Sequence, residues 1–463
     1  MFEQWLQGRP GATCLIDGER SWSRQAFSQA VDVEVAALVA QGVCSGAIVA
    51  WLGHNSARLL ATLLACERIG SVLLPLNWRL SVAELATIVH HAGAGHLLGT
   101  PELDELREVL LQRVTLRPGR AEGIEVGDCL LVYTSGTTGN PKGALHTAAG
   151  MQANVRAAIA AQDLDAHSRA LAVLPMFHVG GLCIQTLPTL ATGGAVILNA
   201  RFSPDDWFDS LRDSHPSTSL LVPAVMRALI EHPRWPQADL SSLSFVCAGS
   251  QVVPAALIAA FHRRGVPVAQ IYGATETGPV SIVLRHDEAQ RPDLRGGLPA
   301  LGVQVRLAAD GEILLRAPNL MRGYHRQPGA SFDDGWFRTG DLAQQHANGR
   351  IEVVGRSKEL IISGGENIHP AEIENLLAGW PGVAEAVVVG LPDPRWGEVP
   401  VLVLVVQAAA TLDLVALQAL FDARLARFKH PHRIVQMHDL PRTALGKVQK
   451  ARLTRLLQAG EGG

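Results

Sequence analysis

Short apolar runs alternate with amphipathic stretches along the first two-thirds of the chain. Ala47–Trp51 is apolar throughout, which is typical of a buried strand, and Val72–Leu76 repeats this pattern. Between these two runs, Ser56–Ile69 carries leucines at positions 59, 60, 63 and 64, which is the spacing of one helix face. The pattern therefore predicts a strand, a helix and a second strand in succession.

The same alternation continues towards residue 271. Ser81 and Glu84 have the spacing of a capping box, which predicts a helix that runs to His91 and stops at Gly93. Further strands and helices are predicted in turn at Ser219–Val222, Ala224–Ile230, Leu243–Ala248, Pro254–Arg264 and Val266–Ile271. Strands separated by helices of this length favour the α/β class, with doubly wound and mostly parallel sheets.

The pattern changes from about residue 300. Short alternating strands with glycine turns, such as Glu312–Arg316 and Ile351–Val354, predict a small antiparallel β lobe. After Arg356 the chain becomes α+β, with strands expected at Val383–Val389 and Val401–Val406 and helices at 370–377 and 414–428. We therefore expect a large N-terminal domain of residues 1–357 and a smaller C-terminal domain of residues 358–463.

Composition narrows the function classes. The chain has 463 residues, of which 48% are hydrophobic and 18% charged, and its formal net charge is −3. A balanced charge gives no footprint for nucleic acid, and no apolar run reaches the roughly 18 residues of a membrane helix. The first residues lack the pattern of a secretory signal, and the six cysteines are scattered without a C-x-x-C pair. We expect a cytoplasmic protein with neither a nucleic-acid partner nor a membrane span.

A glycine- and hydroxyl-rich loop follows the apolar run Cys129–Val132. It ends in Lys142, and its spacing differs from the Walker pattern, because Pro141 replaces the second glycine. Glycines let backbone N–H groups turn towards an anion, hydroxyls add donors, and the lysine supplies a mobile positive charge. This predicts a cradle for a nucleotide triphosphate. Its expected contacts are Thr134, Ser135, Gly136, Thr137, Thr138, Gly139 and Lys142.

Four further motifs follow along the chain. One is the segment 271–277 at the carboxyl end of a predicted strand. Its aromatic ring could stack on adenine, its glycine and hydroxyl could approach the phosphate, and its carboxylate could hold Mg²⁺. The others lie at 335–342, 355–368 and 441–448. In this order, the five motifs resemble the adenylate-forming superfamily of acyl-CoA synthetases, peptide-synthetase adenylation domains and luciferases. The bacterial acyl- and aryl-CoA synthetases are the nearest match.

The resemblance implies roles for individual residues. It places Tyr272 at adenine, Thr275 at phosphate, Glu276 at Mg²⁺, and Asp341 and Arg356 at the ribose. It makes Lys447 the catalytic lysine that contacts the carboxylate and the α-phosphate. The other residues that it makes catalytic are Thr134, Glu276 and His178. It also implies a hinge at Lys358 about which the C-terminal domain moves. The remaining implied contacts are Gly249, Ser250, Gly273 and Ala274 with the nucleotide, and Gly364 and Gly365 with the CoA tunnel.

The segment 175–183 resembles the border of the acyl pocket. The resemblance makes His178 a gate between the carboxylate and CoA sites, with Val179, Gly180 and Cys183 on the pocket wall. Because this stretch holds no Arg or Lys, it disfavours a dicarboxylate and favours an aryl, hydroxycinnamic or medium-to-long fatty acid. An o-succinylbenzoate–CoA ligase stays open as the named alternative.

The expected reaction has two steps. An ionised carboxylic acid attacks the α-phosphate of ATP with Mg²⁺, releasing pyrophosphate, and the thiol of coenzyme A then displaces AMP from the acyl-AMP. An adenylation enzyme that loads a carrier protein, a catalytically inactive relative that only binds ligand, and a luciferase are the other classes left open. A monomer and a homodimer both stay open.

Overall fold

The computed structural model describes residue 5 and residues 9–134, 142–249, 253–291, 294–327, 332–363, 366–407, 410, 412–425, 427–443 and 446–460, with the backbone alone for residues 358, 367 and 423. Contacts divide the chain into two units. The first holds residues 1–250, 261–305 and 315–338, and the second holds residues 251–260, 306–314 and 339–463. The domain boundary at 357/358 and the hinge at Lys358 stay predictions.

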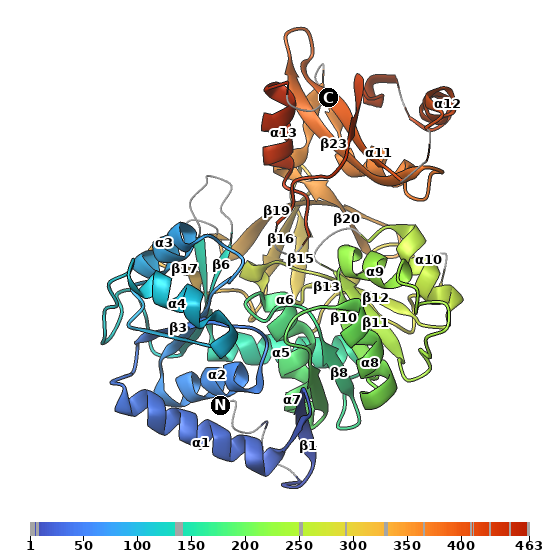
Figure 1. Cartoon of the computed structure of the whole chain (residues 1–463). Coiled ribbons are helices and arrows are strands. Elements are labelled where there is room, and N and C mark those ends of the chain that lie inside the picture. Colours follow the sequence, from blue (N-terminus) through green and yellow to red (C-terminus); the bar gives the residue numbers. More distant parts are fainter. Residues whose placement is uncertain are drawn as a thin grey trace. The chain divides into compact units, whose positions relative to one another are not determined.

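Two sheets form the body of the first unit (Figure 1). The nine-stranded sheet has the order β14-β13-β12-β11-β10-β8-β9-β1-β2, and its central pairs from β12 to β1 are parallel. Its strands are β1 (Thr13–Asp17), β2 (Arg20–Ser23), β8 (Arg169–Ala172), β9 (Ala195–Leu198), β10 (Thr218–Leu221), β11 (Phe245–Gly249), β12 (Val268–Tyr272), β13 (Ile282–Leu284) and β14 (Leu298–Pro299).

The six-stranded sheet has the order β17-β7-β6-β4-β3-β5; the pairs β6–β4, β4–β3 and β3–β5 are parallel, whereas β7 is antiparallel to both β6 and β17. Its strands are β3 (Ile48–Leu52), β4 (Val72–Pro75), β5 (His96–Gly99), β6 (Asp128–Thr134), β7 (Lys142–Thr147) and β17 (Gly323–Tyr324). Alternate residues of β3 enter different cores: Val49 and Trp51 join one cluster, and Ile48 and Ala50 join another. Because both faces of this sheet are covered, the strand is an uninterrupted apolar run in the sequence.

Helices pack on both sides of these sheets, and α1 lies against α2 in Figure 1. Ser81 caps α3, where the reciprocal bonds with Glu84 form the predicted capping box, and Gly93 ends the helix in the left-handed conformation. The helices are α1 (Arg24–Ala40), α2 (Ala57–Ile69), α3 (Val82–Ala92), α4 (Asp104–Leu111), α5 (Ala148–Gln162), α6 (Val179–Gly181), α7 (Leu187–Thr192), α8 (Pro204–Ser214), α9 (Pro223–Ile230) and α10 (Ala255–Arg263). The predicted α/β class is confirmed.

A curled antiparallel sheet follows, with the order β15-β16-β19-β18 and β20 paired to β19. This is the predicted small β lobe, although its strands reach further than expected. They are β15 (Gln304–Leu307), β16 (Glu312–Arg316), β18 (Phe332–Asp333), β19 (Trp336–Gln345) and β20 (Ile351–Arg356).

The remaining elements of the second unit form an α+β layer structure. Val388, Leu402 and Leu404 face a core with α11 and α12, whereas their neighbours in β23 and β24 face a core with α13. Because helices cover both faces of β23 and β24, these strands also contain continuous apolar runs in the sequence. The elements are β21 (Ile361–Ser363), β22 (Glu366–Ile368), α11 (Pro370–Leu376), β23 (Val383–Asp393), β24 (Gly397–Val406), α12 (Leu414–Arg424), β25 (Arg433–Met437) and α13 (Lys450–Gln458).

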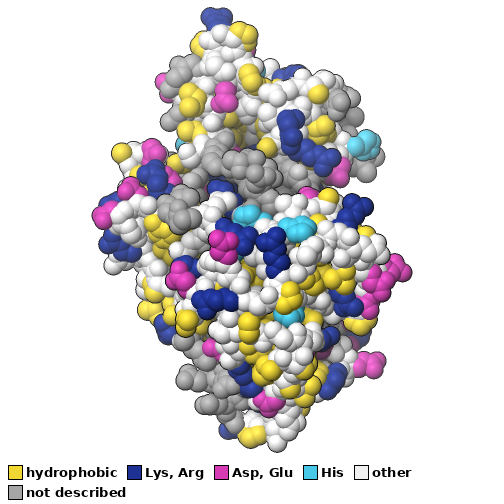
Figure 2. All heavy atoms as spheres, turned by 90° about the vertical axis from the view of Figure 1, so that its left-hand side faces the viewer, with side chains coloured by type: hydrophobic (Ala, Val, Ile, Leu, Met, Phe, Trp, Pro, Cys, Tyr) yellow, Lys and Arg dark blue, Asp and Glu magenta, His cyan; other side chains and the backbone are white. Residues whose placement is uncertain are grey.

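Within the described part of the chain, no helix is long and apolar enough to cross a membrane. Figure 2 shows one face of the molecule, on which basic, acidic and hydrophobic side chains are interspersed. This face carries no broad field of one charge sign, which agrees with the net charge of −3.

Candidate active site

Strands β6 and β7 hold the two ends of the predicted phosphate loop. They pair antiparallel, with Tyr133 opposite Gly143 and Thr134 opposite Lys142. Thr134 and Lys142 are therefore neighbours across the base of the loop. The other predicted contacts of this loop, residues 135–139, lie outside the described residues, as does Ser250.

Lys142, Tyr324 and Glu276 come together in the first unit. The Nζ of Lys142 lies 5.1 Å from the centre of the Tyr324 ring, and the Oη of Tyr324 donates a 2.7 Å hydrogen bond to Oε1 of Glu276. Lys142 comes from β7, Glu276 from a short 3₁₀ turn (Thr275–Thr277) and Tyr324 from β17. The Lys142 ammonium and the Glu276 carboxylate are thus linked through one phenol. The sequence analysis named Lys142 and Glu276 and missed Tyr324.

The turn that carries Glu276 depends on a close approach of backbone. At Gly273, a Cβ atom would collide with the carbonyl oxygen of Pro279, so only glycine fits there. Thr277 then fixes the turn, because its hydroxyl accepts a 2.9 Å bond from the N–H of Ala274. Tyr272 ends β12 directly before this turn, at the carboxyl edge where ligands of parallel sheets gather. Gly249 ends the adjacent strand β11, and its Cβ would meet the backbone of Ile271.

The predicted acyl gate lies in an aromatic cluster. The rings of Phe177 and His178 are 4.5 Å apart, Trp78 lies 6.4 Å from Phe177, and His54 lies 4.8 Å from Trp78. Burial, and to a smaller extent the charge of Arg79, lowers the pKa of His178 to about 4. The His178 imidazole is therefore neutral near pH 7, and its Nε2 has no hydrogen-bond partner among the described residues.

Arg79 supplies the cation that the segment 175–183 lacks. Its Cζ lies 4.3 Å from the centre of the Trp78 ring and 5.8 Å from that of Phe177. The loop after β4 brings this residue to the cluster, so a search within the local stretch could not find it. Of the predicted pocket residues, Val179 and Cys183 are buried and Gly180 is half-buried.

In the second unit, Asp341, Arg356 and Lys447 come together. Asp341 and Arg356 are opposite each other on β19 and β20, and Nε of Arg356 lies 2.9 Å from Oδ1 of Asp341. The Asp341 side chain is only 7% exposed. The pKa of Lys447 is lowered, mainly by burial and to a smaller extent by the charges of Arg356 and Lys450. The charges of Glu359 and Asp341 act in the opposite direction.

The loop before Lys447 is held by its own contacts. Thr443 accepts from the N–H of Lys447 through its hydroxyl and donates its own N–H to the Lys447 carbonyl. Arg442 forms 2.6 Å bonds to both carboxylate oxygens of Glu385. Gly364 and Gly365 lie outside the described residues, and Lys358 is described by its backbone in a 3₁₀ turn (Ser357–Glu359).

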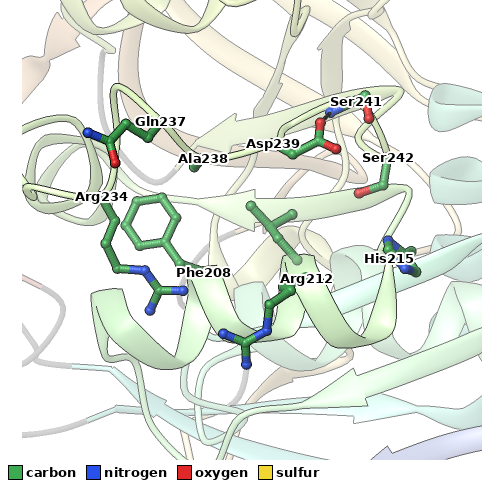
Figure 3. Close-up of a pocket in the computed structure, with 10 residues that line it drawn as sticks. Phe208, Arg212, His215, Arg234, Gln237, Ala238, Asp239, Ser241 and Ser242 are labelled. Atoms are coloured by element: carbon green, nitrogen blue, oxygen red, sulfur yellow. Dashed lines mark hydrogen bonds between the residues drawn. The ribbon is translucent and has the colours of Figure 1, made fainter.

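A separate cavity of about 340 Å³ opens beside α8 (Figure 3). None of the predicted site residues lines it. Its arginines are already paired, because Arg234 contacts Asp205 and Asp209, and Arg212 contacts Asp209 and Asp213. The cavity therefore adds nothing to the predicted chemistry.

Comparison with known proteins decides the family. Residues 2–325 match the model of the AMP-binding enzyme, and residues 372–447 match that of the AMP-binding enzyme C-terminal domain. The chain belongs to the AMP-binding enzyme family. The predicted resemblance to adenylate-forming enzymes is thereby confirmed.

Two curated relatives match almost the whole chain. An indoleacetate–CoA ligase from Aromatoleum aromaticum is 42% identical, with 97% of this chain and 96% of the relative covered. A feruloyl-CoA synthase from Amycolatopsis sp. is 38% identical, with 96% of each covered. With the family, these relatives confirm the predicted enzyme class, an AMP-forming acyl-CoA ligase that uses ATP.

A solved structure gives the same fold. The o-succinylbenzoate–CoA synthetase from Bacillus subtilis, in complex with its acyl-adenylate intermediate, has a TM-score of 0.85 and 29% identity. The match covers 98% of this chain and 97% of that chain.

Proposed function

We propose that this enzyme activates an aromatic carboxylic acid as its acyl-AMP and transfers the acyl group to coenzyme A. The observation that carries the choice of acid is the 42% identity, over nearly the full length, to a ligase named for indoleacetate. The ring cluster of His54, Trp78, Phe177 and His178 supports it, because aromatic rings favour edge-to-face partners at these separations. Of the substrate classes that the sequence favours, aryl acids and fatty acids, we therefore propose the aryl acids.

The first step joins the carboxylate to the α-phosphorus of ATP. The acid is already ionised near pH 7, so its oxygen can attack phosphorus without a general base, and the bond to pyrophosphate breaks. Negative charge spreads over the phosphoryl oxygens as this bond breaks, and a preplaced cation stabilises it. We assign this task to Lys447, with Lys142 and the phosphate loop holding the departing phosphates.

Glu276 suits the predicted Mg²⁺. Its Oε1 accepts a hydrogen bond from Tyr324, which holds the carboxylate in place, and Glu276 would then offer Mg²⁺ the oxygen ligand that this ion prefers. Among the described residues, no group of three His, Cys, Asp or Glu side chains could hold a metal. This agrees with the usual behaviour of Mg²⁺, which takes one or two carboxylates and completes its shell with phosphates and water. When bound, the ion would offset the phosphate charge.

The second step replaces AMP by the thiol of coenzyme A. The thiol gives up its proton to water and its sulfur attacks the acyl carbon. The bond from this carbon to the AMP oxygen breaks, and AMP leaves with that oxygen. A neutral His178 adds no charge of its own beside the aryl acid, which leaves Arg79 as the cation of this cluster, and the aromatic rings would exclude water from the reactive anhydride. For the nucleotide, we assign the ribose to the Asp341–Arg356 pair and adenine to Tyr272.

A substrate panel tests the proposal. Purified protein is incubated with ATP, Mg²⁺, CoA and single acids: indoleacetate, ferulate, o-succinylbenzoate, a medium-chain and a long-chain fatty acid. We expect AMP and an aryl-CoA, measured by mass spectrometry. A fatty acyl-CoA as the main product would contradict the aryl assignment. o-Succinylbenzoyl-CoA as the main product would favour the named alternative, an o-succinylbenzoate–CoA ligase, and acyl-AMP without any thioester would point to a carrier-protein acceptor.

A further inference from the structure

Lys450 makes two ion pairs close in sequence to the predicted catalytic lysine. It is the first residue of α13, three residues after Lys447. Its Nζ lies 2.8 Å from Oε1 of Glu374 and 3.4 Å from Oε2 of Glu359, and its side chain is 21% exposed. Burial alone would lower the pKa of Lys450, but the two carboxylates outweigh this effect and raise it. The lysine is therefore a fixed cation.

These pairs join elements on opposite faces of one sheet. Helix α11, which carries Glu374, packs on one face, and α13 packs on the other. Among the described strands, β23 pairs with β24 alone, so one of its edges has no strand partner. Glu374 accepts a 2.7 Å bond from the N–H of Val388 in β23, and the same Oε1 lies 2.8 Å from Nζ of Lys450.

The second carboxylate belongs to the hinge segment. Glu359 is the last residue of the turn Ser357–Glu359, directly after Lys358, and Arg356 directly precedes this turn. Lys450 thus ties the start of α13 to the segment that carries Arg356. Arg442, on the same loop as Lys447, binds Glu385 of β23 and the carbonyl of Gly446 instead.

We propose that Lys450 is a positioning residue, which fixes Lys447 relative to Arg356 and the hinge segment through Glu359 and Glu374. This inference rests on the proposed function, because it gives Lys447 its task in adenylation. A half-buried lysine between two carboxylates is poorly suited to stability alone, since apolar residues of similar volume stabilise as well or better. Fixing one geometry is the best-attested use of such a group.

The test separates the two half-reactions of the full-length enzyme. Adenylation is measured as acid-dependent pyrophosphate release without CoA, and thioester formation is measured from supplied acyl-AMP. In Lys450→Met we expect kcat of adenylation to fall by about 10-fold to 100-fold, the usual cost of a displaced catalytic group, with little change in KM for the acid. Thioester formation should stay near the wild-type rate, and Lys450→Arg should restore most of the adenylation.

Lys429→Met is the matched control. Lys429 also pairs with α11, since its Nζ lies 2.7 and 2.8 Å from the two carboxylate oxygens of Glu372, but this pair involves neither Glu359 nor Glu374. We expect this variant to keep both half-reactions. If Lys450→Met unfolds, Glu359→Gln is used instead, because it removes the charge that Lys450 pairs with in the hinge segment and keeps the pair with Glu374.

Three results would overturn the inference. One is wild-type adenylation by Lys450→Met, or by Glu359→Gln where that variant replaces it. Another is an equal loss in both half-reactions, which would indicate general destabilisation, and the third is an equal effect of Lys429→Met. A wild-type enzyme that forms no acyl-AMP from any acid would overturn the proposed function, and this inference with it.

Discussion

Replacing Tyr324 by Phe tests the grouping of Lys142, Tyr324 and Glu276. The substitution removes one hydroxyl, which donates a 2.7 Å bond to Glu276, and keeps the ring 5.1 Å from Lys142. A hydrogen bond to a charged group contributes about 1.5–3 kcal/mol, and the half-buried setting of this pair favours the lower end. At about 1.4 kcal/mol per factor of ten, we expect adenylation to slow by about tenfold.

The assay is acid-dependent pyrophosphate release at saturating ATP, repeated over a range of Mg²⁺ concentrations. Because the Glu276 carboxylate loses its orienting partner, the Mg²⁺ concentration needed for half-maximal rate should rise as well. Tyr133→Phe is the matched control, since it removes a hydroxyl whose 2.7 Å bond goes to Nδ1 of His91 instead. An unchanged rate in Tyr324→Phe, or an equal loss in Tyr133→Phe, would refute the reasoning.

Three further predictions follow from the same geometry. Lys447→Ala should slow adenylation by at least about 10²–10³-fold and spare thioester formation from supplied acyl-AMP, and equal damage to both steps would argue against its role. Burial and neighbouring cations lower the pKa of Lys447, so this lysine should lose its charge at a pH below the ordinary lysine pKa of about 10.4. The adenylation rate should therefore decrease on the alkaline side of the pH–rate profile, and Lys447→Arg should move this decrease to higher pH. Burial lowers the pKa values of His146, His178 and His325 to about 4 in the folded protein, whereas an ordinary histidine has a pKa of about 6.5. Between these two pH values the unfolded state therefore binds more protons than the folded state. The free energy of unfolding by urea should therefore decrease as the pH falls from about 6.5 to about 4, and a constant value over that range would contradict these shifts.

Local rules predicted the first unit well, because strand and helix signals there agree with one another. The capping box of Ser81 and Glu84 and the left-handed stop at Gly93 need only neighbours in the sequence, and all three are confirmed. Helix α12 shows the limit of the same rule. Its expected end at residue 428 is wrong, since Arg424 is the last helical residue and Leu425 takes an extended conformation that buries it.

The site is harder to predict where residues come from distant parts of the chain. Tyr324 reaches Glu276 because β17 pairs with β7, a contact that no local pattern signals. A compositional signal was available, since the chain has only three tyrosines and the other two lie at predicted motifs: Tyr133 is the last residue but one of β6, and Tyr272 ends β12. Arg79 and Lys450 were missed for a similar reason, because their partners depend on tertiary packing.

The central claim is that the reaction proceeds through an acyl-AMP made from an aryl acid. It is tested most directly with indoleacetate carrying ¹⁸O in both carboxylate oxygens, incubated with the enzyme, ATP, Mg²⁺ and CoA. Because a carboxylate oxygen attacks the α-phosphorus and stays there when the thiol attacks carbon, the AMP should carry one ¹⁸O and the thioester should keep the other. AMP without label, or label in inorganic phosphate beside ADP, would contradict the account.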